Sequence, residues 1–196
     1  MRIIAGQHKG VKLYISTDKK TRPLKDMVKE SIFNFLTHSN KLPFQLKQSN
    51  ILDLYSGTGS FGLECISRKA EKVVFVEQGK EAIEILKKNI NKLKEKNRMK
   101  IFYRDVFDVI NDANLLDCIA NTKFDLIFCD PPFKDTRINS LVKLIISKDL
   151  IKKNGTIILH RHKNSREKFT NHFKIIDERI YGLSKITFGK INSSLP

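Results

Sequence analysis

The sequence predicts an α/β fold, with an open, mostly parallel sheet that an antiparallel hairpin closes at its C-terminal end. Three observations predict this class. From residue 50 onward, short apolar runs alternate with segments in which apolar residues recur every three or four positions. The runs "ILDLY", "VVFVE" and "DLIFC" are almost continuously apolar, as in parallel strands that helices cover on both faces. The chain ends in "FKIIDERIYG" and "SKITFG", whose short link favours an antiparallel hairpin.

The first forty residues predict a small extension of this sheet. Two short apolar stretches, Arg2–Ala5 and Val11–Ile15, flank a turn rich in Gly, His and Lys, which predicts a β-hairpin. After the polar loop "STDKKTRP", Pro23 lies near the first turn of a helix expected over Leu24–Leu36. Apolar residues at three- and four-residue spacing predict one buried stripe on that helix, made of Met27, Val28, Ile32, Phe33 and Leu36.

The remaining elements follow the alternation of strands and helices. We expect strands at Asn50–Tyr55, Lys72–Glu77, Lys100–Tyr103, Phe124–Cys129 and Thr156–Arg161. We expect helices near Ser60–Arg68, Lys80–Glu95, Val106–Asn111 and Arg137–Ser147. Residues Asn111–Thr122 have little pattern, so the connection between the third and fourth strands is left unassigned.

Composition restricts the class of protein. A chain of 196 residues with 40% hydrophobic content can bury a full core in one domain. The longest apolar runs are far too short to span a bilayer, and the N-terminus has no export signal, so we expect a cytoplasmic protein away from membranes. Cys65, Cys118 and Cys129 have no CxxC spacing and are expected to be free thiols. The five histidines show no metal spacing, and we expect no metal.

The charge is unevenly distributed. The chain has 37 Lys and Arg against 21 Asp and Glu, a formal charge of +16. Residues 1–50 and residues 151–196 each hold 10 basic and 3 acidic side chains, whereas the residues between them are almost balanced. A generally lysine-rich surface would account for this excess. A polyanion held by groups that flank a near-neutral core, most plausibly nucleic acid, is the functional interpretation.

The first candidate site follows the strand "ILDLY". Gly57, Gly59 and Gly62 form a GxGxxG loop between that strand and a helix, where bare backbone allows a ligand to lie at the helix N-terminus. Such ligands collect beyond the carboxyl ends of parallel strands. Glu77 ends the next strand, where an acid accepts hydrogen bonds from ribose hydroxyls. Either a dinucleotide or another adenosine compound would fit these features.

Two further acids favour S-adenosylmethionine as the cofactor. Asp53 precedes the glycine loop, and its carboxylate would repel a pyrophosphate but attract a sulfonium and an α-amino group. Asp105 ends the third strand and could accept from an adenine amino group. Each acid has a structural alternative, since Asp53 could cap the loop and Asp105 could be the N-cap of the helix that follows.

The second candidate site is the turn Asp130-Pro131-Pro132-Phe133 at the end of the fourth strand. The prolines fix their φ angles, so the turn is stiff and the Pro131 carbonyl can be aimed. A carboxylate and a carbonyl that accept from an exocyclic amino group would stabilise the positive charge that develops on it. Phe133 offers a face on which a flipped base stacks. The alternative is an ordinary β-turn with a solvent-facing acid and a core aromatic.

Three side chains near this turn have groups that could take part in chemistry. A thiol beside the turn would permit covalent attack, but Cys129 lies on the strand and is expected to be a small buried residue. His160 and His162 alternate on the last parallel strand and are expected to be structural or to face RNA.

Five segments in order carry a resemblance to a known family: "MRIIAGQHKGVKL", "TRPLKDMVKESIFNFL", "ILDLYSGTGSFGLECISRKAEKVVFVE", "FDLIFCDPPF" and "ERIYGLSKITF". With them the chain resembles the RsmD-type family of bacterial small-subunit ribosomal RNA guanine-N2 methyltransferases. It implies a class I methyltransferase with a Rossmann-like sheet and an added N-terminal hairpin, which acts on the 2-amino group of one guanine in 16S ribosomal RNA. By position it assigns Asp53, Gly57 and Gly59 to the methionine side of the cofactor, Glu77 to the ribose, Asp105 to the adenine, and Asp130, Pro131, Pro132 and Phe133 to the amino-methylation motif.

The resemblance also implies partners and a division of the chain. Residues 1–40 would be an RNA-contacting extension and residues 41–196 the methyltransferase domain of a monomer that acts within an assembling small subunit. We assign RNA contacts to Arg2, Lys9, Lys12 and Arg22. Arg22 could instead clamp the cofactor carboxylate or be an exposed loop arginine. Phe133 stands where the family often has tyrosine, so stacking survives without a phenolic hydrogen bond.

Three rival functions remain open. The same turn would serve adenine-N6 in DNA or RNA, or the side chain of a protein glutamine. A nicotinamide-dependent oxidoreductase is disfavoured by Asp53 and by the turn at Asp130. A noncatalytic RNA-binding protein is disfavoured by the intact glycine loop.

Overall fold

The chain is described by a computed structural model over residues 1–16, 24–42, 44–112, 114–115, 117, 121 and 123–192. The strands are β1 Asn50–Leu54, β2 Lys72–Glu77, β3 Met99–Tyr103, β4 Phe124–Cys129, β5 Ile151–His162, β6 Phe173–Tyr181 and β7 Ser184–Ile191. The helices are α1 Asp26–His38, α2 Ser60–Ser67, α3 Lys80–Leu93, α4 Val106–Ile110 and α5 Ile138–Ser147, with a short 3₁₀ turn η1 at Lys96–Arg98.

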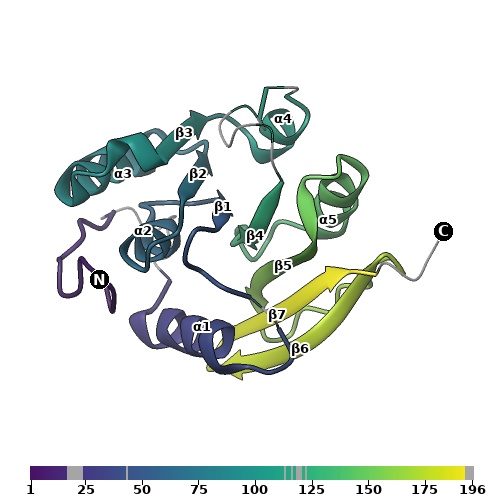
Figure 1. The fold of residues 1–196 in the computed structure, drawn as a ribbon. Coiled ribbons are helices and arrows are strands. Elements are labelled where there is room, and N and C mark those ends of the chain that lie inside the picture. The colour runs from purple at the N-terminus through teal and green to yellow at the C-terminus, as the bar shows by residue number, and fades with distance from the viewer. Residues whose placement is uncertain are drawn as a thin grey trace.

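The predicted fold class is confirmed. The described residues form a seven-stranded sheet in the order β3-β2-β1-β4-β5-β7-β6 (Figure 1). Strands β1 to β5 pair in parallel, and β7 lies antiparallel to both β5 and β6. The last two strands therefore close one side of the sheet as the hairpin that the sequence predicted.

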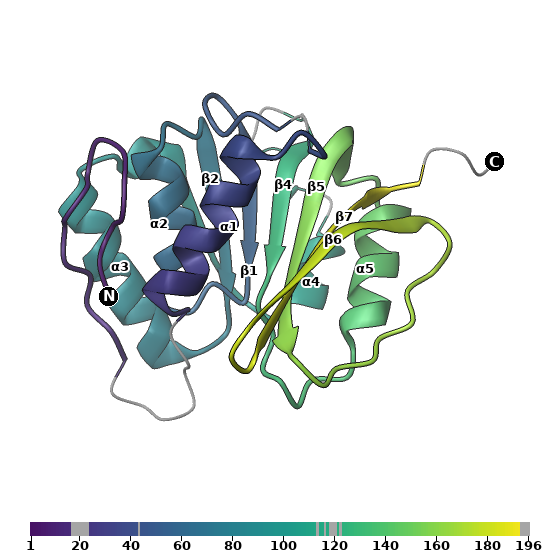
Figure 2. The ribbon, with the colours of Figure 1, turned by 90° about the horizontal axis from the view of Figure 1, so that it is seen from below.

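Helices cover both faces of the sheet (Figure 2). One core contains α1, α2 and α3 and takes Leu126 and Phe128 from β4, while the other contains α4 and α5 and takes Ile127 and Cys129 from the same strand. Successive side chains of a strand point to opposite faces, so an apolar run fills both cores. Within the described ranges, every helix is too short or too polar to cross a membrane.

The predicted N-terminal hairpin forms, although its two arms share only one β-bridge, between Arg2 and Lys12. Ile3 N donates across it to the Val11 carbonyl at 3.0 Å. Other backbone groups bond to neighbouring helices, since Ile4 N donates to Glu64 Oε2 at 2.7 Å and Tyr14 N donates to Asn89 Oδ1 at 2.8 Å. Ile3 and Leu13 point into the core. The segment is thus a strap over α2 and α3 rather than a free-standing hairpin.

Helix α1 begins and ends two residues later than predicted, and one position of its stripe is wrong. Met27 is 62% exposed, whereas Val28, Ile32, Phe33 and Leu36 are buried as expected. Lys29 is buried in its place, with a side chain that is fully inaccessible. A lysine in an apolar stripe needs partners, and the structure supplies them close to the glycine loop.

Strand β5 is longer than predicted. It begins at Ile151, where Ile151 pairs with Phe124, and a register irregularity follows before Leu126 pairs with Thr156. The predicted strand covered only Thr156–Arg161, and the polar run "KKNG" before it belongs to the strand as well. Strand β1 ends at Leu54, one residue before its predicted end, because Tyr55 adopts a φ of 57°.

Candidate active site

A pocket of about 280 Å³ opens at the edge of the sheet where the parallel strands end. The chain continues from β1 to β2 on one side and from β4 to β5 on the other, so the strand order changes direction between β1 and β4. Ligands of open α/β sheets bind at such a switch point. These strand ends lie along the lower side of the molecule in Figure 2. The predicted residues that line the pocket are Asp53, Gly57, Glu77, Asp130, Pro131, Pro132 and Phe133.

The glycine loop is built as the sequence predicted. Gly57 and Gly59 have φ angles of 54° and 86°, a region that side chains with a Cβ rarely adopt. A Cβ on Gly59 would lie 2.3 Å from the Leu86 side chain, so α3 packs directly against the loop. Helix α2 begins at Ser60, and its N-cap residue Gly59 has no side chain to cap the first turn. The start of this helix therefore lies next to the pocket, which Ser60 and Phe61 line.

Asp53 is buried at the floor of the pocket, 1% exposed. Its Oδ2 accepts a hydrogen bond from Gly62 N at 3.0 Å, which ties the strand to the first turn of α2. Burial raises the pKa of the Asp53 carboxyl well above its usual range, and the negative charges of Asp130 and Glu77 act in the same direction. A carboxyl in this state gains most from a positively charged neighbour.

Glu77 lines the pocket and also organises the loop. Its Oε2 accepts from Gly57 N at 2.8 Å, and its Oε1 accepts from Gln78 N at 2.9 Å and from Gly79 N at 2.6 Å. Glu77, which was predicted to bind a ribose, thus connects the glycine loop after β1 to the turn after β2. Lone pairs remain on both oxygens for further donors.

Asp105 takes the role of the structural alternative. Its Oδ1 accepts from Phe107 N at 2.8 Å, so it is the N-cap of α4. Its Oδ2 lies 3.9 Å from the guanidinium of Arg137, which also lies over the Phe107 ring at 4.8 Å. Asp105 is not among the residues that line the pocket, although it ends the strand next to Glu77.

The turn after β4 closes over the pocket. Asp135 N donates to the Pro132 carbonyl at 2.8 Å, and Asp130 N donates to the Leu54 carbonyl at 3.3 Å. Pro131 is buried, while Phe133 is half-buried at the pocket wall. The stiff acidic turn therefore lies beside the glycine loop, which is the arrangement that the sequence required.

His160 was missed as a partner of this turn. Its Nδ1 lies 2.8 Å from Asp130 Oδ1, and its Nε2 lies 2.8 Å from Ser184 Oγ. The Nδ1 contact with Asp130 has ion-pair distance without hydrogen-bond alignment, whereas Nε2 shares a hydrogen bond with the Ser184 hydroxyl. The Phe133 ring packs edge-on against His160, with centroids 5.5 Å apart. The sequence placed His160 at the end of a strand, but only the pairing of β4 with β5 reveals what it contacts.

Cys129 is fully buried beneath the turn, as expected. Burial raises the pKa of its thiol, and the charges of Asp53 and Asp130 raise it further. A thiol in this state is a poor nucleophile. Cys65 is also free and buried, and Cys118 lies outside the described residues.

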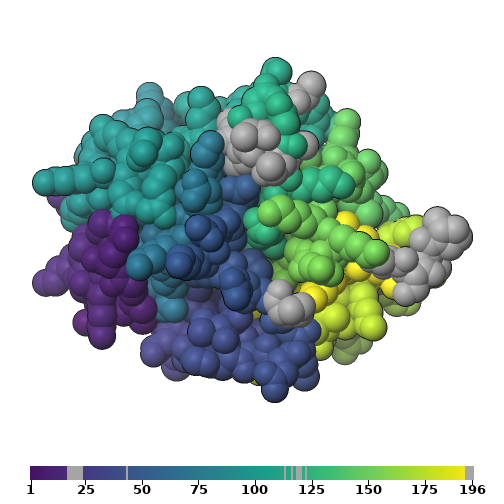
Figure 3. Space-filling model, in the orientation of Figure 1, coloured from purple at the N-terminus to yellow at the C-terminus, as the bar shows by residue number. Residues whose placement is uncertain are grey.

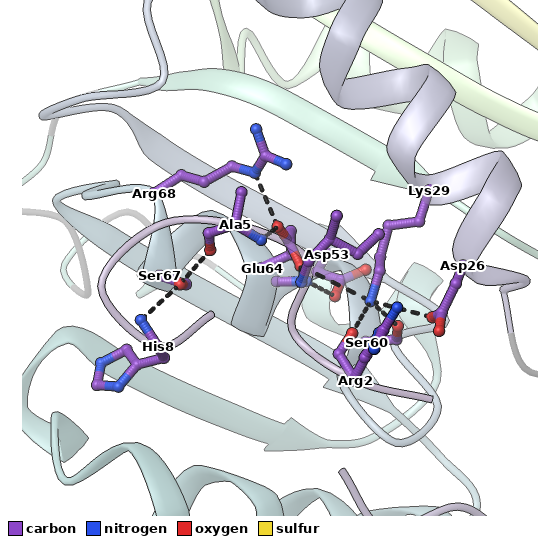
Figure 4. Close-up of polar contacts among 12 residues, drawn as sticks. Arg2, Ala5, His8, Asp26, Lys29, Asp53, Ser60, Glu64, Ser67 and Arg68 are labelled. Carbon is purple, nitrogen blue, oxygen red and sulfur yellow. Dashed lines mark hydrogen bonds and ion pairs between the residues drawn. The ribbon is translucent and has the colours of Figure 1, made fainter. Parts of the chain in front are cut away.

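A buried polar cluster lies next to the first turn of α2 (Figure 4). Lys29 Nζ donates to Ser60 Oγ at 3.1 Å and to the Arg2 carbonyl at 2.8 Å, and it lies 3.8 Å from Glu64 Oε2. Glu64 accepts in turn from the backbone of the N-terminal strap and from Arg68 Nε at 2.8 Å. The cluster connects α1, the strap and the first turn of α2.

The predicted RNA contacts do not gather at the pocket. Arg2, Lys9 and Lys12 are all exposed, and Arg22 lies outside the described residues. Gln7 N donates to the Ser67 carbonyl at the last residue of α2. Because α2 starts at the pocket and runs away from it, the turn around Lys9 lies toward the opposite edge of the sheet. Figure 3 shows the N-terminal segment, in purple, as a surface patch beside α3.

Comparison with known proteins gives consistent matches. The family model described as "Conserved hypothetical protein 95" matches residues 1–190. "Ribosomal RNA small subunit methyltransferase D" of Haemophilus influenzae is 32% identical over 187 residues, 93% of this chain and 90% of that protein. "Putative rRNA methyltransferase YlbH" of Bacillus subtilis is 29% identical and covers 97% of this chain and 98% of its own. The solved structure of a putative methylase from Haemophilus influenzae superposes with a TM-score of 0.76 at 28% identity, over 97% of both chains.

Proposed function

Because this chain belongs to the RsmD family, whose model carries the description conserved hypothetical protein 95, we propose that it is an RNA methyltransferase. It transfers a methyl group from S-adenosylmethionine to the exocyclic N2 amino group of one guanine in 16S ribosomal RNA. One observation carries the proposal: the acidic turn at Asp130 and the glycine loop line the same pocket. The printed names of two relatives, both ribosomal RNA methyltransferases, support the substrate class.

The pocket residues fit the cofactor. Gly57 lines the pocket with bare backbone beside the first turn of α2, while Gly59 allows α3 to pack against the loop. S-adenosylmethionine supplies a methyl group bound to a positively charged sulfur. The buried Asp53 carboxyl favours a cationic neighbour, and Glu77 offers oxygens at the predicted ribose position. We keep Asp105 as the adenine contact, through whichever lone pairs its capping role leaves free.

The acceptor side is formed by the turn. Asp130 and the Pro131 carbonyl would accept the two N–H bonds of a guanine amino group and stabilise the charge that develops on its nitrogen. Phe133 would stack on the flipped base, a contact worth about 1–3 kcal/mol. Holding the amino group in line with the methyl group is the main contribution of the protein to the rate.

Transfer is direct in this proposal, with no covalent bond between enzyme and base. The nitrogen lone pair attacks the methyl carbon as the carbon–sulfur bond breaks, and the nitrogen then loses a proton. The buried, protonated thiol of Cys129 supports a mechanism without a nucleophilic cysteine.

We extend the proposal to the partner. The substrate is 16S ribosomal RNA in an assembling small subunit, which a cytoplasmic monomer meets. Residues 1–40 form the RNA-contacting extension through Arg2, Lys9, Lys12 and Arg22, and residues 41–196 form the methyltransferase domain. The formal charge of +16 favours a polyanionic partner.

Mass mapping of methylated nucleosides in ribosomal RNA tests the proposal. Cells that lack this protein should lose one N2-methylguanine from 16S RNA, and wild-type protein should restore it. Asp130→Ala should fail to restore it while RNA affinity stays within about twofold, because the carboxylate acts on the amino group during transfer. A matched Asp149→Asn variant, altered at the opposite edge of the sheet, should restore the nucleoside.

Two results would contradict this assignment. If the missing modification is N6-methyladenine or a methylated protein glutamine, the acceptor is wrong although the methyltransferase class stands. If Asp130→Ala lowers RNA affinity as much as turnover, the carboxylate serves binding instead of transfer.

A further inference from the structure

The acceptor turn is held by a buried arginine on the neighbouring strand. We propose that Arg161, at the end of β5, is a positioning residue for methyl transfer because it fixes the turn Asp130–Phe133. The inference rests on the proposed function for its kinetic consequence. That Arg161 orders the turn follows from its contacts alone and does not depend on the proposed function.

Arg161 donates to three carbonyls of this turn and the residues after it. Its Nη1 donates to the Pro132 carbonyl at 3.2 Å, and its Nη2 donates to those of Phe133 at 3.5 Å and Asp135 at 2.7 Å. The two prolines lack N–H groups, so the turn has few donors with which to hold itself. Arg161 leaves the Pro131 carbonyl to the substrate, as the proposed function requires.

The guanidinium is itself held in place. Arg161 is 4% exposed, and its Nε donates to Glu167 Oε1 at 2.7 Å. Glu167 Oε2 lies 3.6 Å from Lys185 Nζ on β7. A planar group with five donors can bond a carboxylate on one edge and carbonyls on the other, which the single ammonium of a lysine cannot do. The arginine thus connects the turn to the rigid end of the sheet.

The preceding residue holds the other side of the turn. Consecutive residues of a strand point to opposite faces of the sheet. His160 is 3% exposed and reaches the Asp130 carboxylate from one face, while Arg161 reaches the carbonyls from the other. His162 adds an edge-on contact to Phe133, with ring centroids 5.4 Å apart. Three consecutive residues of β5 therefore contact the acid, the carbonyls and the aromatic ring of the turn.

The central test is Arg161→Lys, which keeps the positive charge but loses the planar set of donors. We expect kcat for methyl transfer to ribosomal RNA to fall at least about tenfold, because small misplacements of reacting groups are costly. The dissociation constant for S-adenosylhomocysteine should stay within about twofold of wild type, since the glycine loop is untouched. Glu167→Gln keeps an acceptor for Nε and should lose less activity than Glu167→Ala. Arg179→Lys, at an ion-paired arginine on β6, is the matched control and should keep wild-type kcat.

Hydrogen exchange gives a readout that is independent of activity. The Asp135 amide donates to the Pro132 carbonyl within the turn, so Arg161→Lys should speed exchange of residues 133–135 and Arg179→Lys should not. Unchanged exchange with unchanged kcat overturns the inference. A parallel loss of kcat, S-adenosylhomocysteine affinity and melting temperature also overturns it, since that pattern indicates general damage. If wild-type protein methylates no ribosomal RNA, the proposed function fails, and the exchange result alone decides whether Arg161 orders the turn.

Discussion

At the scale of single residues, Asp53 is a carboxyl whose protonation the pocket controls. It is buried, one of its oxygens is bonded to Gly62 N, and two further acids lie in the same pocket. Burial first, and then the charges of Asp130 and Glu77, raise its pKa. The pocket without a cation therefore disfavours the ionised form of Asp53 relative to an exposed aspartate. A bound sulfonium or α-amino group would act in the opposite direction.

Cofactor affinity should therefore depend on pH through Asp53. The pKa of Asp53 is higher in the free pocket than in the pocket that holds a cation. Between these two pKa values, cofactor binding releases a proton from Asp53, so affinity rises with pH. The dissociation constant should change by up to about tenfold per pH unit there, and calorimetry in buffers of different ionisation enthalpy should detect the proton.

The variant Asp53→Asn tests whether Asp53 causes the pH dependence of cofactor affinity. Asp53→Asn keeps an oxygen for Gly62 N but removes the charge, so affinity should weaken about tenfold or more and the pH slope should flatten. Asp149→Asn, at an exposed ion pair on the opposite edge, should leave both unchanged. A slope that persists in Asp53→Asn would mean that another group takes up the proton.

Much of the pocket could be predicted because its residues follow parallel strands. Asp53, Glu77 and Asp130 each lie at or near the end of an apolar run, and such ends meet at one edge of a sheet. His160 and Arg161 could be placed at a strand end but not given contacts. Their roles depend on the register of β5 against β4 and β7, which sequence patterns do not encode.

At the scale of elements, the N-terminal strap and α1 are connected by one buried charge cluster. Lys29 on α1 contacts Glu64 on α2, and both side chains are fully inaccessible. Burial lowers the pKa of the Lys29 ammonium, while the charges of Glu64 and Asp26 act in the opposite direction. Because Lys29 also donates to Ser60, the cluster fixes the start of α2 under the glycine loop.

Removing Lys29 from its ion pair with Glu64 should strongly lower the free energy of unfolding. Lys29→Met leaves Glu64 with Arg68 as its remaining cation and removes the buried donor to Ser60 and the Arg2 carbonyl. We expect this to cost about 3–5 kcal/mol and to lower the melting temperature by roughly 10 °C. The double variant Lys29→Met/Glu64→Gln should recover part of that loss, because a neutral amide at position 64 does not need the buried ammonium as a partner. Lys87→Met, at an exposed pair on α3, should change stability by less than about 0.5 kcal/mol. Calorimetry of all three variants measures the effect, and equal losses for Lys29→Met and Lys87→Met would remove the cluster from this role.

The elements that sequence patterns defined best are the ones buried on both faces. The bounds of β2 and β4 agree with prediction to the residue, since apolar runs with sharp polar ends leave little choice. The N-terminal hairpin has one β-bridge in place of two full strands, because only some of its N–H groups bond across it and the others bond to the side chains of Glu64, Ser67 and Asn89. Tertiary hydrogen bonds of this kind leave no local signal in the sequence.

At the scale of the whole molecule, the proposed RNA contacts and the pocket lie toward different edges. The turn that carries Lys9 packs against the far end of α2, while the acceptor turn lies where the strands finish. An RNA that reached both would have to run along the side of the molecule formed by the strap and α3. Such a contact adds affinity through phosphates without touching the modified base.

The strap lysines should affect RNA affinity and not the transfer step. The double variant Lys9→Gln/Lys12→Gln should weaken binding to ribosomal RNA and reduce the slope of log K against log salt by about one to two, as expected for two lost phosphate contacts. Single-turnover rates at saturating RNA should stay at the wild-type value. Lys148→Gln, at the exposed end of α5, serves as the control. If the salt slope does not change, the strap does not meet phosphate.

The strand order has a consequence for biosynthesis. The central strand β1 bonds to β4 along one side, yet β4 is made only after β2, β3 and the helices between them. During translation, the nascent first half therefore presents an apolar strand with one bare edge until its second neighbour emerges from the ribosome. Shielding of that edge by a chaperone would aid the yield of native protein, and ribosome-bound chains halted before β4 should be far more sensitive to protease than chains halted after β7.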